Sequence, residues 1–246
     1  SWRRAILFIG LGGLSGVLFV ALVLTQSRSA WLGFAAGVAV LLWLRGRWGR
    51  VILIGAAAVG VMAVVLLGPE RLWPASSAPA ATGELGTVFT PSLADRVEIW
   101  SRAVYGLQDF SFTGMGLGTF RYVMPVLYPL FTVSPEVDLG HAHNEWLQAG
   151  VDLGLAGLVA FLALQGLSSM LAYQAFRRPL PAMVRWMMAG VLAGLVAHGI
   201  FGLTDAVALG AKPGIFWWLL LALTAAVWRL SETSTWPLAS SSQTTI

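Results

Sequence analysis

The sequence predicts an all-α protein: a polytopic transmembrane helix bundle of about six spans, with a long, partly helical loop outside the cytoplasm. Of its 246 residues, 57% are hydrophobic and only 11% are charged, whereas soluble domains have a charged fraction of about 25%. Apolar runs near the roughly 20 residues that a helix needs to cross a bilayer recur along the whole chain. The sequence lacks the short alternating segments that are typical of a membrane β-barrel, which favours helices.

The expected spans form two groups of three. Residues 1–67 hold the first group and residues 144–230 the second, with 68–143 as an extracytoplasmic loop and 231–246 as a disordered cytoplasmic tail. The spans are expected at 5–24, 29–44, 51–67, 144–171, 183–204 and 213–230.

The arginines predict the orientation. If the six spans are right, nine arginines fall on one side of the membrane, and the positive-inside rule makes that side cytoplasmic, together with both termini. The net charge of +4 then reflects membrane anchors, and no nucleic-acid partner is expected. The absence of cysteine excludes thiol catalysis. The nine are Arg3, Arg4, Arg45, Arg47, Arg50, Arg177, Arg178, Arg185 and Arg229.

Residues 92–109, within the long loop, have the pattern of an amphipathic helix. Ser92 is a suitable N-cap, and Asp95 stands three residues later, as in a capping box. The apolar stripe is expected at Val97, Trp100, Val104 and Leu107. The stretch "FTGMGLGTF" then breaks the helix. It lacks the spacing and the lysine of a phosphate-binding loop, so we expect a tight turn laid on the bundle.

The stretch "GHAHNEWLQAGVDLGLAG" (140–157) places polar residues where the fourth span begins. Asn144 is the expected N-cap of that span. A carboxylate inside the bilayer is costly unless it is paired or hydrated, so we expect an outer arginine, Arg28 or Arg96, as its partner. Three polar side chains share one helix face below the cap: Glu145, Gln148 and Asp152.

Two histidines stand at the water interface before this span. His141 or His143 could act there as a general base, with a cap or interface role as the alternative. A metal site is not expected, because two histidines so close share a metal only in an extended segment and the spacing fixes no third ligand. His198 and Asp205, on one face of the fifth span, are further candidates, with hydrogen bonding inside the bundle as the alternative.

Two arginines are candidates for anion binding. Arg28 lies in the short outer connection "TQSRSAW", whose Ser and Gln side chains would complete a donor-rich site for an oxyanion. Snorkelling at a helix end is the alternative. Arg96 lies in the first turns of the outer helix and shares a face with Trp100. A solvated charged face is the alternative there.

Together, these stretches resemble the catalytic half of the O-antigen ligase and O-antigen polymerase family. The resemblance covers most of residues 20–225. Members are multi-span proteins of the bacterial inner membrane that move a glycan from undecaprenyl diphosphate to an acceptor hydroxyl outside the cytoplasm. The matching stretches are "TQSRSAWLGF" (25–34), "SLADRVEIWSRAV…FTGMGLGTF" (92–120), "HAHNEWLQAGVDLGLAGLVAF" (141–161) and "GLTDAV" (202–207).

The resemblance implies a role for each candidate residue. His143, which precedes an asparagine at the head of a span, corresponds to the catalytic base, and Arg28 and Arg96 correspond to two arginines that hold the diphosphate. No metal or other cofactor is implied. The acceptor would be a lipid A core, another glycan unit or a protein, and membrane lipids would surround the spans. Supporting roles fall to His141, Asn144, Glu145, Gln148, Asp152 and Asp205.

Family members usually have about twice this number of spans. We therefore expect an amino-terminal half to precede Ser1 in the complete protein, and without that half the chain could be inactive. Two other functions stay open. A transporter of anions or inorganic carbon would use the same polar groups near the bilayer midplane. A structural partner in an assembly complex predicts that Arg28, Arg96 and His143 do not converge.

Overall fold

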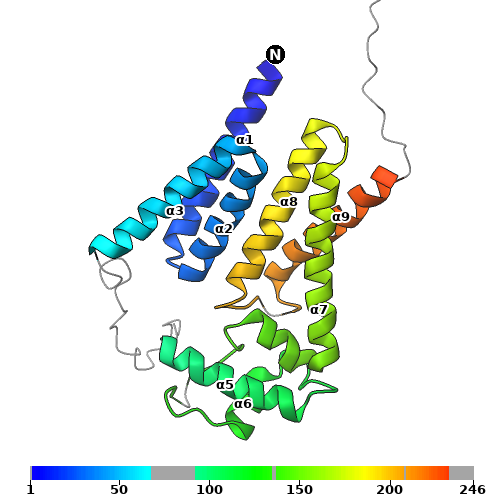
Figure 1. The fold of residues 1–246 in the computed structure, drawn as a ribbon. Coiled ribbons are helices and arrows are strands. Elements are labelled where there is room, and N and C mark those ends of the chain that lie inside the picture. Colours follow the sequence, from blue (N-terminus) through cyan, green and yellow to red (C-terminus); the bar gives the residue numbers. More distant parts are fainter. Residues whose placement is uncertain (1, 68–91, 135–136, 208, 233–246) are drawn as a thin grey trace, which may run out of the picture.

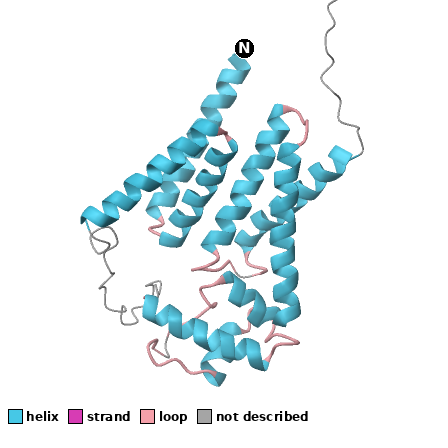
Figure 2. Cartoon of the chain, in the orientation of Figure 1, coloured by secondary structure: helices cyan, strands magenta, loops and turns pink. Residues whose placement is uncertain are grey.

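The computed structural model describes residues 2–67, 92–134, 137–207 and 209–232. All regular secondary structure in these ranges is helical, as Figure 2 shows, and the predicted all-α class is confirmed. Much of the expected irregular part of the outer loop (68–91) and the tail from 233 onward lie outside the described residues.

Six helices occupy the positions of the expected spans to within a few residues. They are α1 (Trp2–Leu24), α2 (Arg28–Leu44), α3 (Arg47–Leu67), α7 (Glu145–Arg177), α8 (Ala182–Phe201) and α9 (Ile215–Glu232). In the part of the chain that the structure describes, α3, α7, α8 and α9 are long and apolar enough to cross a membrane, whereas the apolar parts of α1 and α2 are shorter. The fold is therefore a helical membrane bundle.

Helix α2 packs closely along α8 (Figure 1), because two of its glycines face that helix. A Cβ atom on Gly33 would lie 2.6 Å from the carbonyl oxygen of Ala197, and one on Gly37 would lie 3.1 Å from that of Ala193. Small residues permit such close approach where helices associate in a membrane. Most apolar side chains of α1 and α3 are exposed, so these two helices present broad apolar surfaces.

A buried glutamine joins the three carboxyl-terminal helices. Gln165 of α7 donates from Nε2 to the carbonyl oxygen of Leu195 on α8 at 2.7 Å. Its Oε1 accepts a hydrogen bond from the indole Nε1 of Trp217 on α9, also at 2.7 Å. Both polar ends of the amide are therefore satisfied, as burial in an apolar bundle requires.

Two further helices, α5 (Leu93–Asp109) and α6 (Phe120–Leu127), lie at one end of the bundle, which we call the loop end (Figure 1). The predicted start of the outer helix is confirmed. Ser92 accepts a hydrogen bond from the N–H of Asp95, and the Asp95 carboxylate accepts one from the N–H of Ser92. The two residues form a complete capping box.

The predicted apolar stripe of this helix is partly wrong. Val97 is 56% exposed and Val104 is 38% exposed, whereas Ile99 and Ala103 are fully buried. The buried side faces α6 and the start of α7, and it is rotated by part of a turn from the stripe that hydrophobicity alone indicated. Small Ala103 can approach these elements more closely than a valine, so tertiary packing decides the face.

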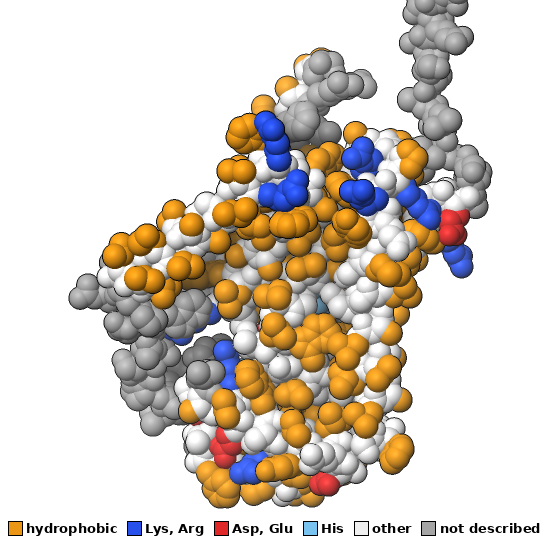
Figure 3. All heavy atoms as spheres, viewed as in Figure 1, with side chains coloured by type: hydrophobic (Ala, Val, Ile, Leu, Met, Phe, Trp, Pro, Cys, Tyr) orange, Lys and Arg blue, Asp and Glu red, His pale blue; other side chains and the backbone are white. Residues whose placement is uncertain are grey.

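The opposite end of the bundle carries basic residues. Figure 3 shows Lys and Arg side chains gathered at the end away from α5 and α6. The α2–α3 and α7–α8 connections lie there (Figure 1). Six of the nine arginines that the sequence assigned to one side stand in these connections or in the first or last turn of the helices beside them. That this end faces the cytoplasm stays a prediction of the positive-inside rule.

Helix α7 is interrupted at Gly154, which has φ 72° and ψ −174°, a conformation that is essentially restricted to glycine. The glycine-rich turn after α5 fills the break. Leu155 N–H donates to the carbonyl of Ser111 (2.7 Å), Met115 N–H to that of Val151 (2.7 Å), and Gly116 N–H to that of Asp152 (3.1 Å). These bonds replace helical ones lost at the break. The stretch "FTGMGLGTF" is thus a turn laid on the bundle, as predicted.

Candidate functional site

His143 lies at the loop end, immediately before α7. Asn144 is the N-cap of that helix, as predicted: its Oδ1 accepts a hydrogen bond from the N–H of Leu147 at 3.0 Å, and its Nδ2 donates to the carbonyl of Leu203 at 3.0 Å. His143 itself has φ 47°, in the left-handed region that residues with a side chain seldom adopt. Such residues cluster at functional sites, where neighbouring contacts hold them.

The imidazole of His143 faces a carboxylate. Its Nδ1 lies 3.4 Å from Oδ1 of Asp205, which follows α8. Burial alone would raise the pKa of Asp205, but the contact with His143, the N–H of Ala206 and the charges of two histidines hold this pKa below its ordinary value. Asp205 is therefore ionised at neutral pH. Nδ1 is buried beside Asp205 and makes no hydrogen bond among the described residues, so Nε2 is the ring nitrogen left for a substrate.

Arg28 begins α2 and is exposed. Ser29, the next residue, is buried, and its Oγ accepts a hydrogen bond from the hydroxyl of Thr204 at 2.9 Å. Thr204 precedes Asp205 in the chain. The amino-terminal end of α2, where Arg28 stands, is therefore hydrogen-bonded to Thr204, and the next residue, Asp205, contacts His143.

Arg96 stands on α5, one turn before Trp100. The indole Nε1 of Trp100 donates a hydrogen bond to the backbone carbonyl of His143 at 3.3 Å. The Nε atom of Arg96 is buried and has no hydrogen-bond partner among the described residues. Arg28 is therefore next to Ser29, which binds the neighbour of Asp205. Arg96 is one turn from Trp100, which binds His143.

The polar face of α7 supports the histidine segment. Gln148 accepts the N–H of Ala142 with Oε1 (2.7 Å) and donates from Nε2 to Oδ1 of Asp152 (2.8 Å). The expected arginine partner of Asp152 is therefore wrong. The Gln148 amide instead binds one oxygen of the buried carboxylate, whereas Oδ2 of Asp152 has no hydrogen-bond partner among the described residues. The same amide holds the N–H of Ala142, between His141 and His143.

The buried Glu145 and the partly buried His198 form a pair where α7 meets α8. Oε1 of Glu145 lies 3.4 Å from Nε2 of His198, and the N–H of Glu145 donates to the carbonyl of Gly202 at 2.8 Å. An outer arginine is therefore not the partner of Glu145 either. The polar interaction inside the bundle, which the sequence left as one alternative for His198, is what the structure contains.

His141 lies against His143, with ring centroids 4.4 Å apart. Its Nδ1 accepts the backbone N–H of His143 at 3.1 Å. Burial lowers the pKa of His141, and the positive charges of His143 and Arg121 lower it further, against the opposite influence of Asp205. His141 is therefore a neutral neighbour of His143 at neutral pH.

Three side chains at this point could hold a metal ion, because ligand atoms of His141, His143 and Asp205 all lie within 4.8 Å of one another. Sequence spacing did not indicate the third ligand, which tertiary structure supplies. However, Nδ1 of His141 accepts an N–H, so the proton of this neutral ring resides on the other nitrogen. The nearby charge of Arg121 also disfavours a cation.

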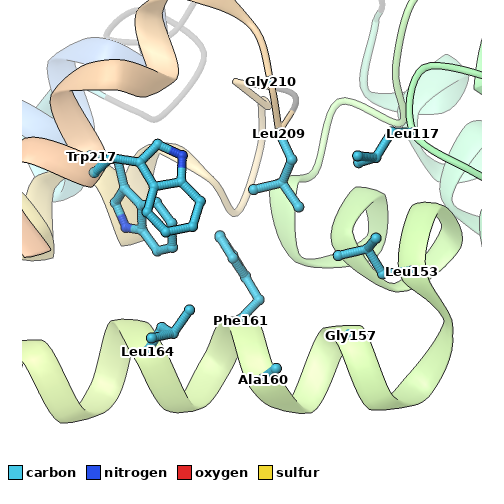
Figure 4. A pocket seen from close by; sticks show the side chains of 10 residues that line it. Leu117, Leu153, Gly157, Ala160, Phe161, Leu164, Leu209, Gly210 and Trp217 are labelled. Carbon is cyan, nitrogen blue, oxygen red and sulfur yellow. The ribbon is translucent and has the colours of Figure 1, made fainter.

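An apolar cleft of about 380 Å³ opens between α7, α9 and two loop-end connections (Figure 4). Its lining includes Leu153, Phe161, Leu209 and Trp217. The Trp217 ring stacks on His198, with centroids 6.1 Å apart, and His198 pairs with Glu145. The cleft therefore lies beside the Glu145–His198 pair, whose glutamate is two residues after His143 in the chain.

The fold and the site together define a helical membrane protein. Its histidine–carboxylate pair and two arginine-bearing helix ends lie at the loop end. The sequence profile described as O-antigen ligase matches residues 13–162, more than half of the chain. The protein therefore belongs to the O-antigen ligase family, a family of membrane glycosyltransferases that act on lipid-linked glycans and glycan acceptors. No curated protein gives a match.

The matched range includes Arg28, Arg96 and His143, whereas Asp205 lies beyond it. Sequence reasoning missed two contacts of this site, namely the Ser29–Thr204 hydroxyl pair and the bond from Trp100 to His143. The only available signal for the second was the shared helix face of Arg96 and Trp100. Nothing in the sequence pointed to the first.

Proposed function

We propose that the protein transfers a glycan from an undecaprenyl-diphosphate carrier to an acceptor hydroxyl at the extracytoplasmic face of the bacterial inner membrane, without a metal ion. The observation that supports this proposal is the pair of contacts made by His143. One side of this residue contacts Asp205, next to the anchor of the Arg28 helix end, and the other contacts Trp100, one turn from Arg96. A base and two guanidinium groups suit a diphosphate leaving group.

The reaction would proceed in one displacement. Nε2 of His143 accepts the proton of the acceptor hydroxyl as its oxygen attacks the anomeric carbon. The bond from that carbon to the diphosphate oxygen breaks, and its electron pair stays on the diphosphate. The configuration at the anomeric carbon is inverted. Arg28 and Arg96 stabilise the leaving group's charge, and Asp205 stabilises the imidazolium that forms.

Two further features support a lipid-linked donor. The apolar cleft lies within the bundle at the loop end and could take part of a hydrocarbon chain (Figure 4). His143 and Asp205 lie in connections outside the helices, whereas a transporter needs polar groups near the bilayer midplane and broken helices in repeated halves. The acceptor is a lipid A core, another glycan unit or a protein, and supplying each in turn in the assay below identifies it.

A transfer assay with an undecaprenyl-diphosphate glycan tests the proposal. His143→Ala should abolish product, since it removes the proposed base, while membrane insertion is retained. His141→Ala should cause a milder loss, because its ring only neighbours the base. Retained transfer by the His143 variant, or equal loss in both variants, would remove His143 from the role of base. Chelation of divalent metals should leave the rate unchanged.

A further inference from the structure

Trp100 connects the outer helix to the segment that carries the base. It is half-buried on α5, and its indole N–H donates to the carbonyl of His143. The proposed mechanism gives Trp100 no role, because it assigns the proton to His143 and the diphosphate to the two arginines.

The carbonyl that Trp100 holds belongs to a residue with an unusual backbone. His143 is one of two residues other than glycine with positive φ in the described ranges, the second being Gln26. This conformation is unfavourable for an isolated histidine, so contacts on each side must maintain it. Gln148 holds the N–H of Ala142 before it, and Leu203 holds the side chain of Asn144 after it.

Two contacts hold the backbone of His143 itself: Trp100 binds its carbonyl, and Nδ1 of the neighbouring His141 accepts its N–H. The contact from Trp100 is the one that comes from a distant helix. The direction of the Cα–Cβ bond follows from the backbone angles, so a change of φ at His143 would swing its ring relative to Asp205. The 3.4 Å contact between Nδ1 and Oδ1 therefore depends on the left-handed conformation. The Trp100 indole secures that conformation from the side of the arginine-bearing helix.

We propose that Trp100 is a positioning residue for the base: its indole N–H holds His143 in the backbone conformation that aims the imidazole at Asp205. Because Trp100 stands one turn after Arg96 on the same helix, it also fixes the base relative to that arginine. This inference rests on the proposed function, in which His143 is the base.

The test replaces the N–H with the least change of shape. Trp100→Phe removes the donor, and benzothienylalanine at position 100 keeps the bicyclic ring with sulfur in place of N–H. Loss of one such hydrogen bond should lower kcat about tenfold. The KM for the donor glycan should stay within about twofold, because ground-state binding is untouched. Trp186→Phe is the matched control and should change neither constant. Trp186 is 46% exposed and lies near the start of α8, at the end of the helix away from Asp205.

A double-mutant cycle separates positioning from general loosening. If Trp100 acts by aiming His143 at Asp205, Trp100→Phe should cost much less in an Asp205→Asn background, where there is no charge to aim at. Fold losses that multiply in the double variant would overturn the proposal. So would a wild-type kcat in the benzothienylalanine protein, which retains packing even if the Phe variant folds poorly.

The outcome also separates this inference from the proposed function. If His143→Ala retains transfer, the proposed function fails and the role of Trp100 fails with it. If His143→Ala is inactive but both Trp100 variants behave like Trp186→Phe, then only the positioning role is wrong.

Discussion

Nδ1 of His143 lies 3.4 Å from Oδ1 of Asp205, and this contact joins the segment before α7 to the segment after α8. The carboxylate favours the tautomer with its proton on Nδ1, which leaves Nε2 as the basic nitrogen. Asp205→Asn removes the charge that would stabilise the imidazolium. We expect kcat for glycan transfer to fall by about 10²-fold or more, with intact membrane insertion.

The matched control for this change is Asp138→Asn. Asp138 has a side chain that is 68% exposed and pairs with Arg121 at 3.5 Å, and exposed pairs of this kind contribute little. Transfer by the Asp138 variant should stay near the wild-type rate. An Asp205→Asn protein that is equally active would show that the carboxylate does not assist the base.

Arg28→Lys and Arg96→Lys keep a positive charge at each position and remove the planar fork that binds a diphosphate bidentately. If both guanidinium groups hold the diphosphate, each change should lower kcat/KM for the lipid-linked donor by about tenfold or more. Arg47→Lys, at the start of α3 and the far end of the bundle, should have no effect. Unchanged kinetics in either loop-end variant would exclude that arginine from diphosphate binding.

Gly154→Ala should destabilise the protein. At φ 72° an alanine is strained, and its Cβ would lie 2.7 Å from the carbonyl oxygen of Ser111. We expect a loss of about 1–3 kcal/mol or more in the free energy of unfolding, measured in detergent. Gly166→Ala is the control. A Cβ there meets nothing within 4 Å, so helix propensity should make that change neutral or stabilising by up to about 1 kcal/mol. Equal effects would contradict the role given to the break.

Glu98 should make the loop end sensitive to acid. Burial raises the pKa of Glu98, but hydrogen bonds from the Thr132 hydroxyl and from the N–H groups of Thr132 and Phe131, with the charge of Arg102, lower it overall from 4.5. A lowered pKa means that the stabilisation is complete above pH 4.5 and is lost as the pH falls through the folded-state value.

The measurement is the unfolding midpoint between about pH 6 and about pH 3, in wild type and in Glu98→Gln. The difference between the two proteins should be constant above pH 4.5 and shrink below it, because the glutamine does not titrate. A difference that grows on acidification would reverse the assigned sign.

The elements of the fold that could be predicted are those with local causes. The spans follow from apolar length, and the start of α5 follows from Ser92 and Asp95, which are neighbours in the chain. The elements that could not be predicted depend on contacts between distant segments. Asp152 finds an amide instead of an arginine because Gln148 is one turn away and already held by Ala142. The exposure of Val97 reflects what α6 and α7 place beside α5.

The candidate site divides in the same way. Residue type and interfacial position singled out His141 and His143 as candidate bases and Arg28 and Arg96 as candidate anion-binding residues. The family resemblance favoured His143 as the base and assigned both arginines to the diphosphate. The contact with Asp205 could not be derived, because it depends on how the start of α7 and the end of α8 lie side by side. The backbone conformation of His143 leaves no trace in residue types, since histidine only rarely adopts it.

The break at Gly154 determines where the outer segment could be cut if it were transplanted between relatives to exchange acceptor specificity. Hydrogen bonds from Met115 to Val151, from Gly116 to Asp152 and from Leu155 to Ser111 cross the apparent border between loop and membrane helix. A graft that ends at Asn144 would bring in the glycine-rich turn of one protein without the broken helix to which that turn is hydrogen-bonded. The natural boundary of a transplantable cassette lies beyond Leu155, inside the hydrophobic stretch.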